Sequence, residues 1–527
     1  MYSAVRHAKS HIILIAALLL AAGIKLWLFL SSAVPFNGDE AVGAVMARHI
    51  LEGARPVFFY GQAYMGSNYA YLIAAGFALF GQKVGVMRFI EAVLYLIYML
   101  TVWGIGRRFF KDKWVADIAV VLAAVPPLLV TTYTTVYFGT YGETLILGNV
   151  ILLLGYEVIY GKYRDSKAPW LLLGAVSGFA FWNLGMAGVY ILPVAAIGLW
   201  KLKWKPWMSY GLCAVGFVVG SMPWWLYNFN HEWAAWLALT EASLGPVTTG
   251  QRIFGLIFFG IPAVLGLRPP WTATYLPWPV VFLWVYLFLG ATIYMIKGEK
   301  SGETIMNPGS RGLLMLLTLV FCGFFAFSHY GVDATGRFFL PLYLPVNLFL
   351  AAFIAAARRQ KPAFAMIILA AALGLNGYAT WLASNSEERI TTQFDPIAQI
   401  DNQHDAALIA FLDEEGELRG YSNYWVSYRL AFLSGERLIF AARIPYRADL
   451  SYTTRDDRYP AYTELVEKSG QTAYITTNHP ELNGIIAQGL LELDVSFDEI
   501  DIGDYHIFYH LDRAVRPTEL GLGVPYP

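Results

Sequence analysis

Residues 34–53 read VPFNGDEAVGAVMARHILEG, and they follow directly on an apolar run, 12–30, that is long enough to cross a bilayer. The stretch opens with two adjacent acids, Asp39 and Glu40, and continues with apolar residues at helical spacing. Its Asn-Gly-Asp start is a helix-start signal that puts Asp39 at the N-cap, and Gly53 ends the helix. The sequence therefore predicts an amphipathic helix that lies along the outer membrane surface and begins with a carboxylate pair.

The composition is that of a membrane protein. Of the 527 residues, 57% are hydrophobic and only 14% are charged, whereas soluble domains average about 25% charged residues. Aromatic residues make up 16% of the chain, which fits belts of Trp and Tyr at both membrane surfaces. The two cysteines, Cys213 and Cys322, both lie in apolar runs, so we expect no disulfide framework and no Cys-based metal site. We expect no nucleic-acid partner.

The apolar segments predict about eleven transmembrane spans. They lie at 12–30, 84–106, 114–135, 141–160, 169–183, 186–200, 206–228, 275–296, 312–330, 337–357 and 363–383. The first run is longer than the core of a signal peptide, so we expect a retained span, in which Lys25 snorkels to the interface. Asn183 and Gly185 predict a tight reversal within 169–200. The apolar stretch 251–269 predicts an interfacial or re-entrant helix.

Lys and Arg residues predict the orientation in the membrane. With a cytoplasmic N-terminus, the N-terminus and the inner loops carry 18 of the 26 basic residues before residue 385, and the outer loops carry seven. An odd number of spans then puts residues 385–527 outside, and this segment holds 24 of the 38 acids but only 11 of the 37 bases. We therefore expect a multi-pass protein of the cell (plasma or inner) membrane with two domains. They are a transmembrane domain, 1–384, whose first outer loop is 33–83, and a soluble extracytoplasmic domain, 385–527.

The C-terminal segment alternates two kinds of pattern. Helical stretches such as DAALIAFLDEEG and YPAYTELVEKSG stand between strand-like ones such as TAYITTN and YHIFYHL. This alternation predicts a small α/β or α+β domain. Its aromatic stretch YSNYWVSYRL suits sugar stacking, and equally suits a core strand or helix.

Further polar residues are expected at the outer ends of the spans. Glu143 begins a span in the stretch TTVYFGTYGETL and would face the same compartment as the first acid pair. His329, Asp333 and Arg337 share the outer turn SHYGVDATGRFFLPLY, and Arg88 enters its span from the outside. An arginine can anchor a helix at the interface or grip a phosphate bidentately. We therefore regard Arg337 and Arg88 as candidate phosphate ligands.

One reaction type accounts for these outer groups: transfer of a sugar from a polyprenyl phosphate to an acceptor hydroxyl. A phosphate leaving group needs positive charge but no proton donor, which the arginines provide. The acceptor hydroxyl needs a base, and a carboxylate across the anomeric carbon provides it with inversion. A long lipid carrier also explains why the site should open towards the bilayer.

The first outer loop resembles that of GT-C glycosyltransferases. The stretch GDEAVGAVMARHILEG is followed by FFYGQAYMGSNYAYLIAAGFALFG and VMRF. This pattern is most similar to the branch with the protein O-mannosyltransferases, the aminoarabinose transferase of lipid A and the RgtA/B/C/D-like enzymes. GETLILGNVILLL resembles the start of the family's fourth span, and GRFFLPLYLP resembles its late RYxLPxxP-type turn, with Phe338 where Tyr is common. The resemblance covers about residues 10–360.

The resemblance implies a helical GT-C fold and specific site residues. Asp39 would be the catalytic acid of the family motif, with Glu40 beside it. Apart from this resemblance, we expect substrate contacts from the loop and turn positions Tyr64, Glu143, His329 and Asp333. Some relatives bind a divalent metal and others none, so a metal cofactor stays open, with His49 and His329 as the nearby histidines.

Several alternatives stay open at this point. The acceptor is a glycan, a lipid or a protein, and membrane lipids surround the spans. A polytopic transporter or lipid-carrier flippase is the main rival, although transporters usually place ionisable groups near the midplane within related halves. A non-catalytic scaffold, or a polymerase or ligase of the cell envelope, is a third possibility.

Overall fold

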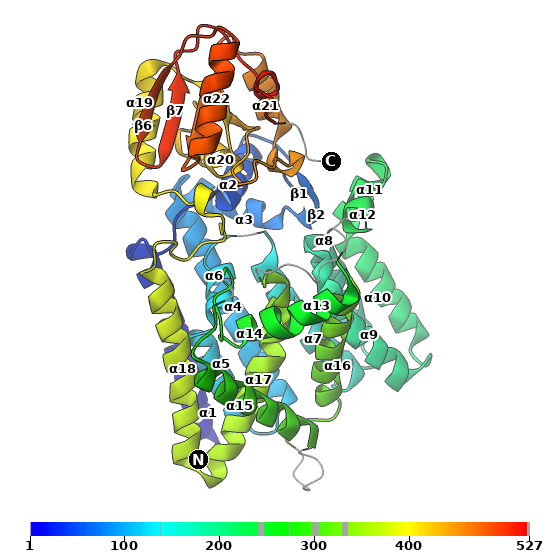
Figure 1. The fold of residues 1–527 in the computed structure, drawn as a ribbon. Helices are drawn as coiled ribbons and strands as arrows, with labels where there is room; N and C mark the ends of the chain where they lie inside the picture. The colour runs from blue at the N-terminus through cyan, green and yellow to red at the C-terminus, as the bar shows by residue number, and fades with distance from the viewer. Residues whose placement is uncertain are drawn as a thin grey trace.

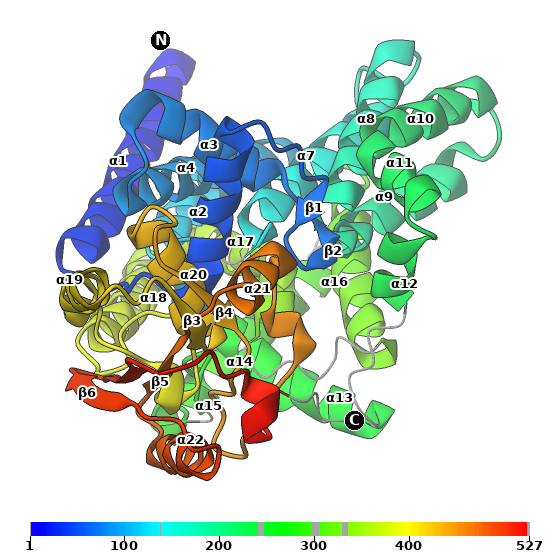
Figure 2. The same cartoon turned by 90° about the horizontal axis from the view of Figure 1, so that it is seen from above.

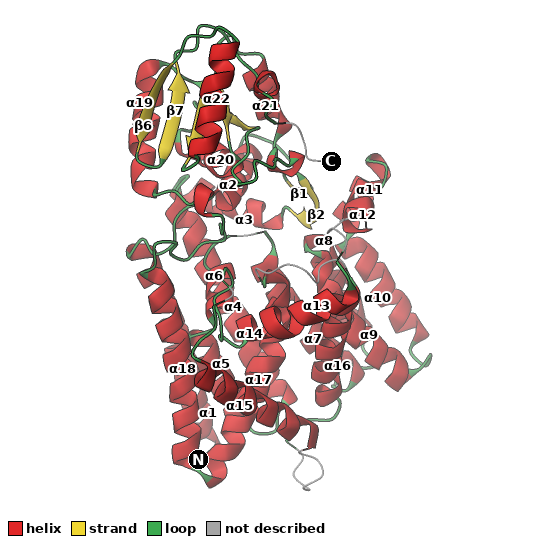
Figure 3. Cartoon of the chain, in the orientation of Figure 1, coloured by secondary structure: helices red, strands yellow, loops and turns green. Residues whose placement is uncertain are grey.

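The computed structural model describes residues 2–137, 139–240, 247–272, 274–297, 305–328 and 336–523 (Figure 1). Helices make up the part that spans the membrane. Apart from one short hairpin, the strands gather in the C-terminal part, which lies at one end of the helices (Figure 3). The predicted class, a helical polytopic membrane protein with a small sheet domain at its C-terminus, is confirmed.

Eight helices in the described ranges are long and apolar enough to cross a membrane, so the chain is a multi-pass membrane protein. They are α1 (Tyr2–Leu30), α4 (Val84–Phe109), α7 (Tyr141–Ile159), η1 with α9 (Gly185–Leu202), α15 (Trp278–Lys297), α16 (Ser310–Phe327), η4 with α17 (Arg337–Gln360) and α18 (Pro362–Ser384). A ninth candidate is the pair α10 (Trp207–Gly220) and α11 (Met222–Asn230), which is bent by 60°.

The number eleven is not confirmed, and two of the expected spans show why. Residues 114–135 form two short helices, α5 (Trp114–Ala124) and α6 (Leu128–Tyr133). The break falls at Pro126 and Pro127, because proline lacks the backbone N–H that a continuous helix needs. The span expected at 169–183 is α8 (Lys167–Asn183), which has only 17 residues. It ends at the predicted reversal, where η1 (Gly185–Ala187) leads into α9 (Gly188–Leu202).

Close glycine contacts join α8 to α10, a pairing that the sequence analysis missed. Each helix carries a Gly-x-x-x-Gly pair, and these pairs let two backbones approach closely in a membrane. They are Gly174 and Gly178 on α8, and Gly216 and Gly220 on α10. A Cβ atom at Gly178 would lie 2.0 Å from the carbonyl oxygen of Phe217. Nothing larger than glycine therefore fits while the two helices keep this distance.

Lys25 of α1 does not snorkel to the interface, contrary to the prediction. Its side chain is buried, and Nζ donates to the carbonyl oxygen of Thr134 at 2.7 Å and to Oγ1 of Thr135 at 2.5 Å. The ammonium group also lies 4.6 Å from the centre of the Tyr95 ring. The reason is that the carbonyl-rich C-terminal end of α6 lies beside it and attracts a cation.

Two helices and a hairpin follow α1 and form a layer beneath the C-terminal part. They are α2 (Gly38–Leu51), β1 (Phe58–Phe59), β2 (Gln62–Gly66) and α3 (Asn68–Phe80). The prediction of an amphipathic helix on the membrane surface is wrong, because every residue of α2 from Gly38 to Ile50 is buried. It packs against α3 on one side and against α20 (Tyr424–Leu433) on another, and the view from above shows α20 over α2 (Figure 2).

The C-terminal part is built around a five-stranded mixed sheet with the order β4-β3-β5-β7-β6. The strands are β3 (Arg419–Ser422), β4 (Ile439–Ala442), β5 (Ala473–Thr477), β6 (Asp498–Ile502) and β7 (Tyr505–Tyr509). Strand β3 pairs in parallel with β4 and β5, whereas β7 is antiparallel to β5 and β6. The helices are α19 (Asp405–Glu415), α20, α21 (Pro460–Glu467) and α22 (Pro480–Glu492). The helical and strand-like stretches named from the sequence are confirmed as α19, α21, β5 and β7.

The expected interfacial segment at 251–269 is a run of short helices. It comprises α13 (Thr249–Gly255), the π-helical η2 (Leu256–Gly260) and α14 (Ile261–Val264), and α12 (Ala234–Thr240) precedes it. Here α13 packs on α16, and α14 packs on α6 and η4. The segment therefore covers the ends of the spans that lie near the C-terminal part.

Replacing Gly178 by Leu should separate α8 from α10. The new side chain has no room beside the Phe217 carbonyl, and overpacking of this kind costs about 1–3 kcal/mol or more. We expect a lower apparent melting temperature for the purified protein in detergent. Gly211→Leu on α10 is the matched control, because a Cβ there meets no atom within 4 Å. Equal melting temperatures for the two variants would contradict the close packing.

Candidate functional site

The site is built on the first turn of α2. The N-cap is Asn37, whose Oδ1 accepts from the backbone N–H of Glu40 at 3.2 Å. The expectation that Asp39 caps the helix is therefore wrong. The residue with extended backbone just before the helix is Asn37, two positions before Asp39. Asp39 is the second residue of α2, and its carboxylate is available for other contacts.

The carboxylate of Asp39 is held by two hydroxyl groups from the C-terminal part of the chain. Oδ1 accepts from the Tyr424 hydroxyl at 2.7 Å, and Oδ2 accepts from the Thr392 hydroxyl at 3.3 Å. The Thr392 oxygen in turn accepts from Nδ2 of Asn37 at 2.8 Å. Asp39 is only 9% exposed. Tyr424 comes from the first turn of α20, and Thr392 comes from the segment between α18 and the sheet domain.

Two guanidinium groups lie within electrostatic range of Asp39. Burial raises the pKa of the Asp39 carboxyl above its usual value, while the Tyr424 hydrogen bond and the charges of Arg458 and Arg337 oppose that rise. A buried carboxylate with a raised pKa is typical of a catalytic base. The two arginines come from different parts of the protein. Arg458 precedes α21 in the sheet domain, and Arg337 begins η4 at the start of a candidate span.

Arg458 reaches the site through the sheet domain. Its guanidinium group lies 5.3 Å from the centre of the Tyr424 ring. With its amide oriented to satisfy both groups, Gln62 of β2 accepts from Nη1 at 2.6 Å and from Nη2 at 3.0 Å. Burial alone would lower the pKa of Arg458, but nearby Tyr424, Tyr64 and Asp39 raise it above its usual value. The predicted substrate residue Tyr64 thus lies in the same cluster.

Glu40 points away from Asp39 and forms a buried ion pair. Its Oε2 lies 2.6 Å from Nη2 of Arg88 on α4, and both side chains are almost fully buried. Burial raises the pKa of Glu40 to about 7, and the Arg88 charge opposes the rise. The other Arg88 nitrogen, Nη1, donates to the backbone carbonyl of Thr135 at 2.8 Å. In this arrangement Arg88, expected to bind a phosphate, holds Glu40 and the neighbouring backbone instead.

The remaining predicted residues are distributed as follows. Arg337 lies over the Phe338 ring, with its guanidinium carbon 5.1 Å from the ring centre. Glu143 is buried in the first turn of α7, and its Oε1 has no hydrogen-bond partner among the described residues. Glu143 and Asp39 both lie within electrostatic range of the Tyr137 ring. The predicted substrate residues His329 and Asp333 lie outside the described residues.

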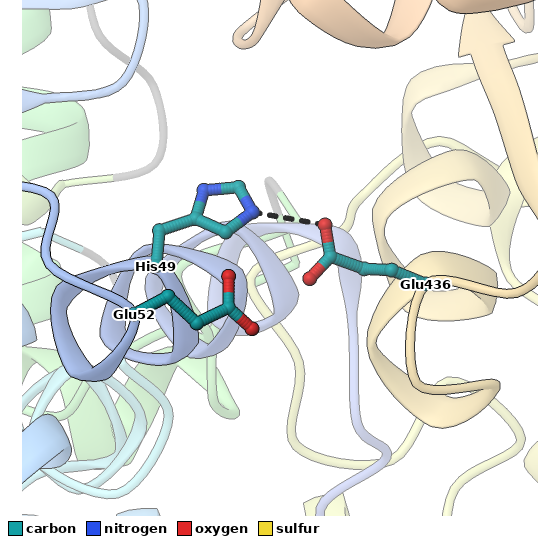
Figure 4. Close-up of side chains that lie close together, drawn as sticks. All are labelled: His49, Glu52 and Glu436. Carbon is teal, nitrogen blue, oxygen red and sulfur yellow. Dashed lines mark hydrogen bonds and ion pairs between the residues drawn. The ribbon is translucent and has the colours of Figure 1, made fainter.

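One group in the described ranges has ligand atoms close enough to share a metal ion, all within 4.8 Å of one another. It consists of His49 and Glu52 at the end of α2 and Glu436 after α20 (Figure 4). His49 Nε2 lies 2.9 Å from Glu436, and Nδ1 lies 3.0 Å from the Tyr60 hydroxyl. Arg48 also lies 3.4 Å from Glu436. These contacts join α2 to the sheet domain, and the Arg48 guanidinium group already occupies one side of the Glu436 carboxylate.

Three contributors to the site were not assigned by the sequence analysis. They are Thr392, Tyr424 and Arg458, all from beyond residue 384. Tyr424 falls in the aromatic stretch YSNYWVSYRL and Arg458 directly precedes the stretch YPAYTELVEKSG, so a signal was present. The sequence alone gave no reason to place either stretch beside Asp39, because some 350 residues or more separate them from it.

Part of the chain matches a known protein family. Residues 68–227 match the family described as dolichyl-phosphate-mannose-protein mannosyltransferase. The undecaprenyl phosphate-alpha-4-amino-4-deoxy-L-arabinose arabinosyl transferase of Pseudomonas aeruginosa (strain UCBPP-PA14) is 25% identical over 321 residues, covering 55% of this chain and 56% of the relative. The corresponding transferase 2 of Pseudomonas fluorescens (strain Pf0-1) is 23% identical over 325 residues, covering 58% and 51%. The chain thus spans about half the length of the curated relatives it matches.

Solved structures share the fold over most of the chain. ArnT from Cupriavidus metallidurans in the apo state has a TM-score of 0.61 at 12% identity, covering 95% of this chain and 98% of that one. Its form bound to undecaprenyl phosphate has a TM-score of 0.59 at 12% identity, covering 94% and 97%. The apo oligosaccharyltransferase of Archaeoglobus fulgidus has a TM-score of 0.53 at 12% identity, covering 89% and 69%. These likenesses show the fold, and together with the family match they confirm the resemblance to the GT-C superfamily.

The buried pair predicts strong coupling between Glu40 and Arg88. Arg88→Met leaves the Glu40 carboxylate buried without its partner, and breaking such a pair typically costs about 3–5 kcal/mol. We expect a large drop in the apparent melting temperature, most of which the double variant Glu40→Leu/Arg88→Met recovers. Arg55→Met, at an exposed arginine after α2, is the control. A wild-type melting temperature for Arg88→Met would contradict the assignment.

Proposed function

We propose that this chain is a membrane glycosyltransferase that moves a sugar from a polyprenyl phosphate to an acceptor hydroxyl on the extracytoplasmic face. The observation that carries the proposal is the Asp39 site itself. A buried carboxylate with a raised pKa lies beside two guanidinium groups, at the end of the spans nearest the sheet domain. The fold shared with ArnT, including its form bound to undecaprenyl phosphate, supports the same function.

Asp39 acts as the general base in this proposal. The acceptor oxygen attacks the anomeric carbon while its proton passes to the Asp39 carboxylate, and the bond from that carbon to the donor phosphate breaks on the opposite face. The configuration inverts, and the polyprenyl phosphate leaves with its negative charge. Oδ2 is the oxygen we assign to the proton, because its hydrogen bond from Thr392 is the longer of the two. Tyr424 keeps Oδ1 fixed and orients the group.

Positive charge for the donor phosphate comes from Arg337, with Arg458 as a second guanidinium near the same carboxylate. A guanidinium group matches a phosphate in both charge and geometry. Arg88 contributes indirectly, because it fixes Glu40 and through it the first turn of α2. Tyr64 and Glu143 are the proposed substrate contacts among the described residues.

The orientation and the division of the chain belong to the same proposal. The basic residues favour a cytoplasmic N-terminus. Nine spans in the described ranges, the number reached when the bent pair α10 and α11 counts as one, would then place the acidic sheet domain on the extracytoplasmic side. We take residues 1–384 as the transferase domain and residues 385–527 as the domain that closes over it. The donor sugar, and an acceptor of the glycan, lipid or protein class, would reach the site from the membrane side.

A transporter or flippase is the alternative, and the place of the acids argues against it. Transporters usually bind their substrates near the bilayer midplane, often at broken helices. Asp39 and Glu40 lie instead in a helix outside the candidate spans, under the sheet domain. Release of free polyprenyl phosphate with consumption of acceptor separates the two functions, since a transporter returns its substrate unchanged.

The two proposed roles predict different kinetic signatures in a purified transferase assay. Asp39→Asn should lower kcat by about 10²–10⁴, because it removes the base. Arg337→Ala should mainly raise the KM for the polyprenyl phosphate donor, because it removes a charge that binds the ground state as well as the transition state. The measurement is the release of labelled polyprenyl phosphate at varied donor concentration.

The stability and pH dependence of the same proteins provide the controls. Burial raises the pKa of Asp39 above the usual 3.8, so the ionised carboxylate reduces folding stability as pH rises through the folded pKa. Asp39→Asn should therefore melt at the wild-type temperature or slightly higher at neutral pH. Wild-type kcat/KM should fall as the pH drops through that raised pKa. Near-normal turnover by Asp39→Asn would reduce Asp39 to a structural residue.

A further inference from the structure

A cavity lies beside the segment that holds Asp39, because Asn37, Thr391 and Gln393 line it. Its volume is about 630 Å³, within the range of small-molecule sites. It opens where two spans leave the membrane, because its walls include Pro35 and Phe36 after α1 and Glu387 to Arg389 after α18. The sheet domain contributes Trp425 and Asp504 to the same cavity. The cavity therefore lies at the junction between the spans and the sheet domain.

The wall combines aromatic rings with many hydrogen-bonding groups. Phe36, Trp271, Phe394 and Trp425 supply the rings. Trp271 lies nearly parallel to Phe394, with 6.2 Å between the ring centres. Asn, Gln and Thr side chains stand between them. Sugars present apolar C–H faces and hydroxyl edges, so they bind sites that combine aromatic faces with amide and carboxylate groups. The cavity has this combination.

The charges in the wall disfavour an anionic ligand. Four carboxylates line it, from Glu387, Glu388, Asp401 and Asp504, against two guanidinium groups. One of these, Arg429, is already neutralised by Asp405 at 2.5 Å. The other, Arg389, donates to the backbone carbonyl of Ser32 at 3.1 Å. A phosphate or an anionic lipid headgroup would meet net negative charge here, whereas a neutral sugar or an amino sugar would not.

The cavity is linked to Asp39 by a short hydrogen-bonded path. Asn37 lines the cavity, and its Nδ2 donates to the Thr392 hydroxyl, which donates to Asp39. One side chain thus separates the cavity from the carboxylate that we assign as the base. A saccharide bound here would therefore adjoin the residues that hold Asp39.

We propose that this cavity is a subsite for the carbohydrate part of the acceptor, holding uncharged or amino-sugar units beyond the one that receives the transferred sugar. The proposal rests on the transferase function for its role, but the binding of carbohydrate can be tested without turnover. It narrows the acceptor class to a glycan or glycan-bearing molecule. It also gives the segment 387–402 a role in binding as well as in holding Asp39.

Binding is measured on the full-length protein in lipid nanodiscs by titration with maltotriose, chitotriose and mannotriose. We expect at least one trisaccharide to bind, and Trp271→Ala to weaken its binding about tenfold through loss of ring stacking. Glu388→Ala, at an exposed residue of the wall, should also weaken this binding. Trp278→Ala is the matched control, because Trp278 is an exposed tryptophan at the start of α15, a few residues after Trp271, and does not line the cavity.

The outcomes separate this proposal from the proposed function. If no trisaccharide binds, or if Trp271→Ala and Trp278→Ala weaken binding equally, the subsite is overturned even when the protein transfers sugar. If a trisaccharide binds and Trp271→Ala weakens its binding more than Trp278→Ala does, but no donor is consumed, the subsite stands and the transferase function fails. Tighter binding of inorganic phosphate than of any trisaccharide, lost in Trp271→Ala, would also overturn the carbohydrate assignment.

Discussion

Asp39 and Glu40 follow each other in the first turn of α2, and both carboxylates are removed from water. Successive helical residues point about 100° apart, so the two acids must find their partners on different sides. Glu40 is held by Arg88 of a membrane helix. Asp39 is held by Tyr424 and Thr392, which belong to the C-terminal part of the chain. Helix α2 lies between the spans and the sheet domain and is buried, because each of these two parts supplies the partner of one carboxylate. This requirement ties the sheet domain to the spans.

The same requirement shapes the chemistry of the site. A carboxylate beneath a folded domain gains a raised pKa from burial, and the hydroxyl groups and guanidinium groups around it keep the pKa from rising further. The sheet domain is therefore part of the proposed active site, because Tyr424 and Arg458 meet Asp39 there. The cavity lined by Asn37 and the segment after α18 extends from this junction. The proposed base, the proposed phosphate ligands and the proposed acceptor subsite thus adjoin one another around one helix start.

The sequence predicted the class of fold and the place of the acid pair at a helix start, because apolar runs and helix-start signals act locally. It missed what depends on distant contacts. The burial of α2, the pairing of Glu40 with Arg88 and the inward path of Lys25 all depend on neighbours that no local pattern reveals. The number of eleven spans is not confirmed, since Pro126 and Pro127 divide an apolar run whose composition alone suits a crossing. The helix that carries Tyr424 was recognised as aromatic, but its position over Asp39 required the tertiary structure.

The most direct test of this account is the pH dependence of kcat/KM in Tyr424→Phe. The Tyr424 hydrogen bond lowers the pKa of Asp39, so its loss should shift the acidic limb of the profile to higher pH while the ring keeps α20 packed on α2. We expect this shift of the acidic limb with little change in the melting temperature of the variant. An acidic limb identical to that of the wild type would show that the sheet domain does not act on the base, and would contradict the central claim.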